Sequence, residues 1–164
     1  MNKNRKEKGF TLIEILIVIG IIALLATIVI IAINPARQFA QARDTKRVSN
    51  VNAILNAIGQ YAADNKGDIL VLGIPQAPAV PGEISDAGVD LCNDLVPTYL
   101  PSLPIDPKTG VEGADTDGDD QVSLDECDDG YNTKYTVQQG DVASGERISV
   151  CAIGDITVDI CVTR

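Results

Sequence analysis

The chain has 164 residues with a formal net charge of −10, and it contains neither histidine nor tryptophan. After residue 50 there are twenty carboxylates against five cations, so the C-terminal part is strongly acidic. Such a surface repels nucleic-acid phosphates, and we expect no nucleic-acid partner. Histidine is the usual general base and a common zinc ligand, so its absence argues against most hydrolase triads and histidine metal sites.

The most apolar stretch covers residues 10–33 and contains a single charged side chain, Glu14. A helix needs about 20 such residues to cross a bilayer, so this stretch predicts one membrane-spanning helix. A carboxylate that faces lipid costs roughly 2.5–3.5 kcal/mol at the bilayer centre, which suggests that Glu14 has a partner. In the alternative hypothesis, Glu14 simply reaches the membrane interface of an ordinary single-pass protein.

A short basic segment precedes this stretch, and the two meet in the sequence Lys-Gly-Phe-Thr-Leu-Ile-Glu at residues 8–14. This motif resembles the prepilin leader of type IV pilins and type II secretion pseudopilins. The resemblance implies that a prepilin peptidase cuts between Gly9 and Phe10 and methylates the new amine of Phe10. It also implies that the retained helix polymerises with copies of itself at an inner-membrane assembly platform.

The same resemblance gives Glu14 a role in assembly. A carboxylate four residues along a helix from the new amine of Phe10 lies on the same face, within reach of that amine or of one on a neighbouring subunit. Packing the pair together would neutralise a buried charge and fix the axial register between helices.

Apolar residues continue at three- and four-residue steps from Val48 to Ala62, which predicts an amphipathic helix. We therefore expect one helix over residues 10–64, kinked or locally melted at Pro35. The expected organisation is a cleaved leader (1–9), a transmembrane and assembly helix (10–33), an amphipathic helix (34–66) and a globular head (67–164).

Four basic residues form a collar just after the apolar stretch: Arg37, Arg43, Lys46 and Arg47. One interpretation is a solvated helix face beside lipid headgroups, and the other is contact with the acidic heads of neighbouring subunits. The positive-inside rule leaves the orientation open, because the apolar stretch has four basic residues on each side. The resemblance places the leader inside the cytoplasm and the head outside.

Seven of the eight prolines lie in residues 68–107, which favours an irregular loop with room for a short helix near residues 84–95. The segment at 99–110 resembles the Leu-Pro-x-Asp-Pro segment of major pseudopilins. Residues 131–137, 147–153 and 156–162 are rich in β-branched and aromatic residues and predict antiparallel strands. Turns are expected at 139–141 and at Gly154-Asp155. The predicted fold class is α+β and pilin-like, with a long N-terminal helix packed on a small C-terminal antiparallel sheet.

Residues 115–126 carry acidic side chains at the spacing of a twelve-residue calcium loop. The predicted oxygen ligands of a structural calcium ion are Asp115, Asp117, Asp119, Gln121 and Glu126. Asp120 stands at the loop position that normally needs glycine, and a solvated acidic loop is the alternative.

The four cysteines, Cys92, Cys127, Cys151 and Cys161, all lie in the part expected to be exported. An even number in an oxidising compartment predicts two disulfides, and reduced thiols in the core are the alternative. Three pairings are possible. A two-residue turn at Gly154-Asp155 would place Cys151 opposite Val158, so the pairing stays open.

These observations predict a non-enzymatic subunit of a type IV pilus or a type II secretion pseudopilus. It would be a single-pass inner-membrane protein before assembly and part of an extracellular or periplasmic filament afterwards. The second hypothesis is a minor or tip pilin that binds a surface, DNA or secreted cargo. A membrane-anchored enzyme ranks last, because no Gly-x-Ser-x-Gly or similar nucleophile motif is present.

Overall fold

The structure is a computed structural model that describes residues 9–110, 121–128, 130–141, 143 and 145–164. The chain divides into two compact units, Met1–Phe39 and Ala40–Arg164. Each unit is described by itself.

The first unit contains helix α1 (Leu12–Ile33) and the start of helix α2 (Pro35–Asp64). The expected interruption falls at Asn34, one residue before the proline, and Asn34 adopts a left-handed conformation with φ of 50°. Asparagine tolerates this conformation better than most residues. Pro35 has no backbone N–H to donate, so it fits the first position of the next helix, where that group would have no partner. The Asn34 side chain also accepts a hydrogen bond from the backbone N–H of Arg37 at 3.4 Å, so it caps α2.

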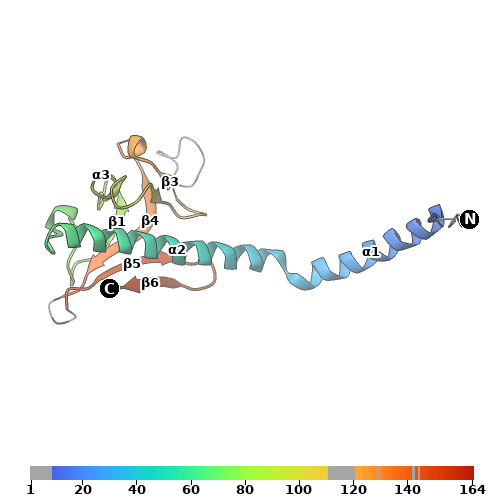
Figure 1. The fold of residues 1–164 in the computed structure, drawn as a ribbon. Coiled ribbons are helices and arrows are strands. Elements are labelled where there is room, and N and C mark those ends of the chain that lie inside the picture. The colour runs from blue at the N-terminus through green and yellow to red at the C-terminus, as the bar shows by residue number, and fades with distance from the viewer. Residues whose placement is uncertain (1–8, 111–120, 129, 142, 144) are drawn as a thin grey trace, which may run out of the picture. The chain divides into compact units, whose positions relative to one another are not determined.

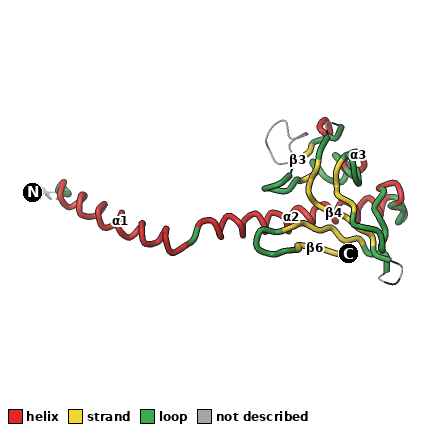
Figure 2. Tube along the Cα trace, turned by 180° about the vertical axis from the view of Figure 1, so that it is seen from behind, coloured by secondary structure: helices red, strands yellow, loops and turns green. Residues whose placement is uncertain are grey.

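In the second unit, α2 packs on one face of a four-stranded antiparallel sheet with the order β1-β4-β5-β6 (Figures 1 and 2). The strands are β1 (Gly82–Ser85), β4 (Asn132–Gln139), β5 (Ile148–Ile153) and β6 (Asp159–Thr163). The predicted α+β fold, a helix covering an antiparallel sheet, is confirmed.

The core lies between the helix and the sheet. Val51, Ile54 and Ile58 of α2 are fully buried, as expected from their helical spacing. They share one apolar cluster with Tyr135 and Val150, which come from every second position of their strands. Burying an aliphatic side chain of this size contributes roughly 1.5–3 kcal/mol, so this face of α2 fixes the sheet on the helix.

The proline-rich region is more ordered than its composition suggests. It contains a 3₁₀ turn η1 (Leu70–Leu72), strand β1, a one-turn helix α3 (Cys92–Leu95) and a two-residue strand β2 (Leu103–Pro104). Strand β2 pairs with β3 (Gln121–Val122), which precedes the 3₁₀ turn η2 (Leu124–Glu126). Strand β1 was not predicted, because four residues are too few to show an alternating pattern.

The connection between β5 and β6 is longer than the expected two-residue turn. Ile153 pairs with Asp159, which leaves a five-residue loop at 154–158. Gly154 is required in this loop, since a Cβ atom there would clash with the backbone carbonyl oxygen of Thr157. The expectation of a turn at Gly154-Asp155 alone was therefore wrong, and the new register places Cys151 opposite Cys161.

Candidate functional site

Helix α1 presents its apolar side chains to the surroundings. It has 22 residues, and none of them is buried in the structure. Each large aliphatic side chain left in water forgoes about 1.5–3 kcal/mol, so such a helix is stable only when lipid or other apolar surfaces cover it. Its length and composition suit a membrane span.

The N-terminus of α1 is closed by a capping box made by Thr11 and Glu14. The Thr11 hydroxyl accepts a hydrogen bond from the backbone N–H of Glu14 at 3.3 Å, and the Glu14 carboxylate accepts one from the N–H of Thr11 at 3.5 Å. Gly9 and Phe10 precede the helix and are exposed. The Glu14 carboxylate therefore turns back towards the end of the helix at which the predicted cleavage bond lies.

A second cluster of charges lies in the head, and sequence reasoning missed it. The Arg47 side chain is 2% exposed and donates two hydrogen bonds to Asp106, from Nε at 2.6 Å and from Nη2 at 3.0 Å. Its Nη1 donates to Asp44 at 2.8 Å and to Asp155 at 3.2 Å. The planar guanidinium suits such a bidentate contact with a carboxylate.

Asp44 holds the β5–β6 loop against α2. Its carboxylate accepts hydrogen bonds from the backbone N–H groups of Asp155 at 2.7 Å, Ile156 at 3.0 Å and Thr157 at 3.3 Å. Burial alone would raise the pKa of Asp44, but these three donors and Arg47 lower it to about 2. The carboxylate therefore stays charged and bound to the loop at neutral pH.

Asp155 completes the cluster from the loop side. Its carboxylate accepts hydrogen bonds from Lys108, from Arg43 at 2.5 Å and from Arg47. These cations, Lys108 first, hold the pKa of Asp155 well below its usual range. Asp106 is also buried, which would raise its pKa, yet Arg47 and the backbone N–H groups of Lys108 and Thr109 lower it. The hydrogen bond to Asp106 in turn raises the pKa of the Arg47 guanidinium above its usual value.

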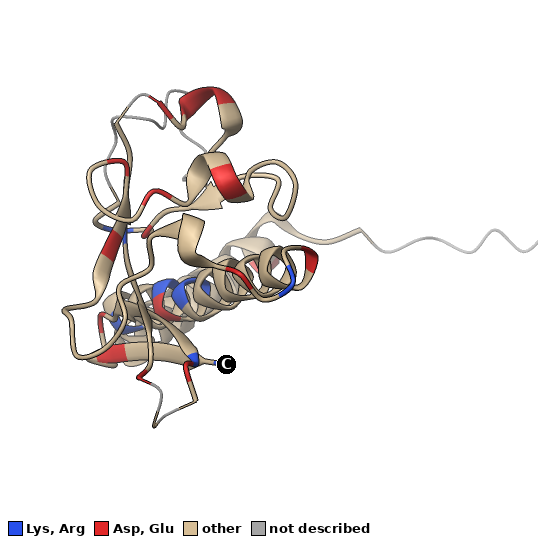
Figure 3. Ribbon diagram, turned by 90° about the vertical axis from the view of Figure 1, so that its left-hand side faces the viewer, with Lys and Arg blue, Asp and Glu red and all other residues tan. Residues whose placement is uncertain are grey.

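This charge cluster is formed by Arg43, Asp44, Arg47, Asp106, Lys108 and Asp155. Two residues of the basic collar, Arg43 and Arg47, thus bind acids of their own head. Figure 3 shows basic and acidic residues close together on α2, with further acids spread over the head. Two of the acids lie 59 and 108 residues from Arg47 in the sequence, so no local spacing reveals the pairing.

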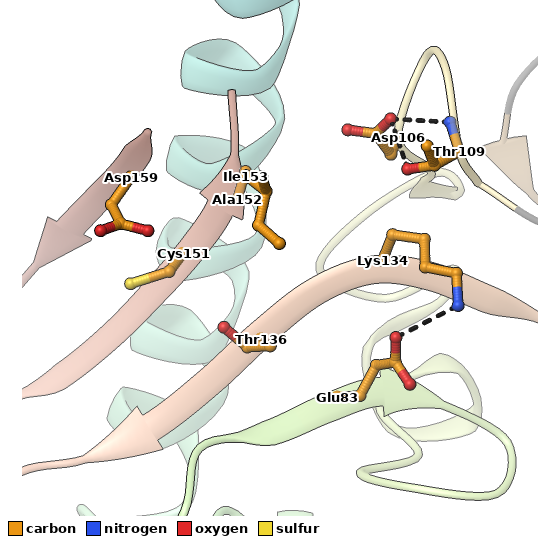
Figure 4. Close-up of a pocket in the computed structure, with 9 residues that line it drawn as sticks. All are labelled: Glu83, Asp106, Thr109, Lys134, Thr136, Cys151, Ala152, Ile153 and Asp159. Atoms are coloured by element: carbon orange, nitrogen blue, oxygen red, sulfur yellow. Dashed lines mark hydrogen bonds and ion pairs between the residues drawn. The ribbon is translucent and has the colours of Figure 1, made fainter. Parts of the chain in front are cut away.

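A hollow of about 270 Å³ lies on the sheet near the cluster (Figure 4). The Lys134 ammonium and the Glu83 carboxylate meet 3.3 Å apart on its wall. Among the residues that the structure describes, no group of three or more potential metal-binding side chains is found here or elsewhere. The hollow offers no arrangement of nucleophile and base.

The predicted calcium ligands are only partly within the described residues. Asp115, Asp117 and Asp119 lie outside them. Gln121 opens strand β3, where its side-chain oxygen accepts a hydrogen bond from the Ser102 hydroxyl at 2.5 Å. Glu126 is nearly buried in η2 and accepts hydrogen bonds from the N–H of Ser123 at 2.9 Å and its hydroxyl at 2.6 Å. Both offer the oxygen donors that calcium prefers.

The four cysteines form two disulfides, Cys92–Cys127 and Cys151–Cys161. The prediction of two disulfides is confirmed, and the alternative of reduced thiols is excluded. The first bond joins α3 to the residue after η2, and both its cysteines are buried. The second crosses directly between β5 and β6.

An exposed apolar helix at the N-terminus, followed by a head in which a second helix packs on an antiparallel sheet, defines the class of pilin-like subunits. Comparison with known proteins supports this assignment. Residues 4–30 match the family of the prokaryotic N-terminal methylation motif. A search of solved structures found no significant match.

Three relatives specify the family. The type II secretion system core protein G of Aeromonas hydrophila is 30% identical over 112 residues, 64% of this chain and 70% of the relative. The same protein of Escherichia coli is 30% identical over 114 residues, 65% of this chain and 70% of the relative. The type IV wide pilus major component of Thermus thermophilus is 38% identical over 81 residues, 46% of this chain and 60% of the relative. The chain belongs to the type IV pilin and type II secretion pseudopilin family, whose members are structural subunits and not enzymes.

Proposed function

We propose that the chain is a major subunit of a type IV pilus or of a type II secretion pseudopilus, and that it polymerises through α1. The observation that carries this proposal is a 22-residue apolar helix of which no residue is buried. Lipid covers the helix before assembly, and copies of the same helix cover it afterwards. The longer alignments with secretion core proteins and the shorter, more similar one with a pilus component support both filament types.

Processing by a prepilin peptidase between Gly9 and Phe10 precedes assembly in this proposal. The two residues lie outside helix α1 and are exposed, as a peptidase substrate needs to be. Cleavage creates a positive amine on Phe10, and methylation retains its charge. Glu14, which already turns towards this end of the helix, then pairs with the amine of Phe10 on a neighbouring copy.

The test is the intact mass of the protein extracted from membranes of its host. We expect the mass of residues 10–164 plus one methyl group, less four hydrogens for the two disulfides. A polypeptide that still begins at Met1, or one that has lost the whole of α1, would contradict the proposal. A minor or tip pilin would show the same mass, so the subunit count in sheared filaments distinguishes it from the major subunit.

We further propose that calcium is bound by Asp115, Asp117, Asp119, Gln121 and Glu126 as a structural ion. Support comes from the spacing of the five residues and from the oxygen-only chemistry of the set. The ion would bring together carboxylates that otherwise repel one another, and it would tie residues 115–119 to the segment that contains β3 and η2.

Replacing Asp117 with alanine tests this site. We expect the variant to melt at a lower temperature than the wild type in calcium, because a ligand that binds only the folded state stabilises it. In excess chelator the two proteins should melt together. An equal difference in both conditions would show that Asp117 acts without a metal.

A further inference from the structure

The β5–β6 loop has its polar groups turned inwards and its apolar side chains turned outwards. The N–H groups of residues 155–157 donate to Asp44, and the Asp155 carboxylate binds three cations of the charge cluster. Ile153, Ile156 and Val158 are instead 75%, 47% and 76% exposed. Surface loops usually show the opposite arrangement.

We name residues 153–158 the hairpin tip. Two sets of contacts hold its backbone in place. The first is the three hydrogen bonds to Asp44, and the second is the close packing of the Thr157 carbonyl oxygen against Gly154. A rigid apolar projection loses little conformational entropy when it binds, which favours a role in recognition. The cluster that holds it contains three cations and three carboxylates, so the charges of the cluster cancel.

The second half of α2 lines an open groove. An open groove of about 470 Å³, the α2 groove, lies between this helix and the end of the sheet. Its lining combines the apolar or small residues Leu55, Gly59, Ala63 and Ile148 with the polar residues Asn56, Gln60 and Arg164. Residues 48–63 contain no charged side chain, although 36 of the 164 residues in the chain are charged.

Gly59 lines this groove from the interior of α2, where glycine is unfavourable. Glycine within a helix is less stable than alanine because its backbone loses more conformational freedom on folding. A Cβ atom added at Gly59 would meet no described atom within 4 Å, so packing within the chain does not explain the residue. Close approach of another molecule would explain it.

We propose that the hairpin tip of one copy docks in the α2 groove of a second copy within the filament. The tip lies beside Asp44, whereas the groove lies beside residues 55–63, about 15–30 Å further along α2. The tip therefore cannot reach the groove of its own molecule. Two different complementary patches on one subunit form a head-to-tail contact, which builds an open filament and not a closed dimer. This inference rests on the proposed function.

The occupant that we assign to the groove is a second copy, because every copy of the chain carries an exposed apolar projection at its hairpin tip. Copies of the acidic head repel one another, but residues 48–63 carry no charged side chain and the groove lining includes the cation Arg164, so this surface does not repel a neighbouring head. The experiment also shows whether the tip instead contacts a lipid surface or an unrelated protein.

The experiment places the photo-crosslinking residue benzoylphenylalanine at Val158 in the full chain and irradiates sheared filaments. We expect a crosslink to the tryptic peptide 48–66 of a second copy. The same probe at Val80, which is 82% exposed and lies outside the tip and the groove, serves as the control and should not label that peptide. A Val158 crosslink to lipid, to another protein or to no partner would overturn the proposal.

A second variant separates docking from folding. Gly59→Leu places a large side chain in the groove at a position where an added Cβ atom meets no described atom within 4 Å, and we expect at least a tenfold loss of sheared filaments with no fall in melting temperature. Gly59→Ala adds one methyl group and should lose less. Normal filament yield from Gly59→Leu would also overturn the proposal.

The wild type separates the two proposals. If it is neither processed nor filamentous, the proposed function fails. If it forms filaments without the crosslink, only the docking contact is rejected.

Discussion

Arg47 joins three separate segments of the head through one side chain. It binds Asp44 on its own helix, Asp106 after β2 and Asp155 between β5 and β6. Removing a buried cation leaves its carboxylates unpaired in a medium that solvates them poorly. The stability of the head should therefore depend on this residue more than on any surface ion pair.

We expect Arg47→Met to lower the free energy of unfolding by about 3–5 kcal/mol. Urea denaturation of the full chain in detergent, followed by circular dichroism, measures this loss. Arg43→Met is the matched control, since the Arg43 side chain is 32% exposed and its ion pair is worth about 1 kcal/mol or less. Equal losses for both variants would contradict the central role of Arg47.

Glu14 has two separable functions at the start of α1, a helix cap and a proposed charge partner. Glu14→Ala should leave membrane insertion and cleavage intact and reduce the yield of sheared filaments, because the amine of Phe10 loses its partner. Thr11→Ala disrupts the same capping box but keeps the carboxylate, so it should retain most of the yield. A normal yield of filaments from Glu14→Ala would contradict the proposed role of Glu14 in fixing the axial register between helices.

At the scale of elements, the two disulfides differ in access to solvent. Cys92 and Cys127 are 0% and 2% exposed, whereas Cys161 is exposed on β6. Thiol–disulfide exchange requires a thiolate to reach a sulfur atom. With reduced glutathione we expect Cys151 and Cys161 to be alkylated first and Cys92 and Cys127 only after unfolding. Mass spectrometry after stepwise alkylation checks the order, and simultaneous labelling would contradict it.

The elements that the sequence predicted are those with a local pattern. Helix α2 followed from the recurrence of Val51, Ile54 and Ile58, and strands β4, β5 and β6 followed from their alternation. The five-residue β5–β6 loop was missed because Asp44, far away in the sequence, fixes its length through backbone contacts. The same holds for Arg47, whose acids become neighbours only after folding. The motif at residues 8–14 needed no folding to be recognised, since a peptidase recognises it as a linear segment.

At the scale of the whole molecule, three carboxylates of the charge cluster have a lowered pKa: Asp44, Asp106 and Asp155. Their unfolded counterparts take up protons near pH 4, whereas the folded groups do so at lower pH. The stabilisation is thus present above about pH 4 and is lost as the pH falls towards 2.

We expect the melting temperature of the wild type to fall over this pH range relative to Arg47→Met, in which the three carboxylates have already lost the one cation that they share. The comparison between the two proteins cancels the repulsion among the other acids, which both proteins share. Parallel curves from pH 6 to pH 2 would show that the cluster does not set the acid sensitivity.

Lipid tails are as apolar as the isoleucine and leucine side chains of α1. When this helix moves from lipid into a bundle of its copies, its contact with water therefore stays almost unchanged. The hydrophobic effect therefore favours neither the membrane nor the polymer, and smaller contributions from ion pairing and from the heads decide the direction of growth. A balance of that kind would let a subunit pass between bilayer and filament in either direction without exposing α1 to water.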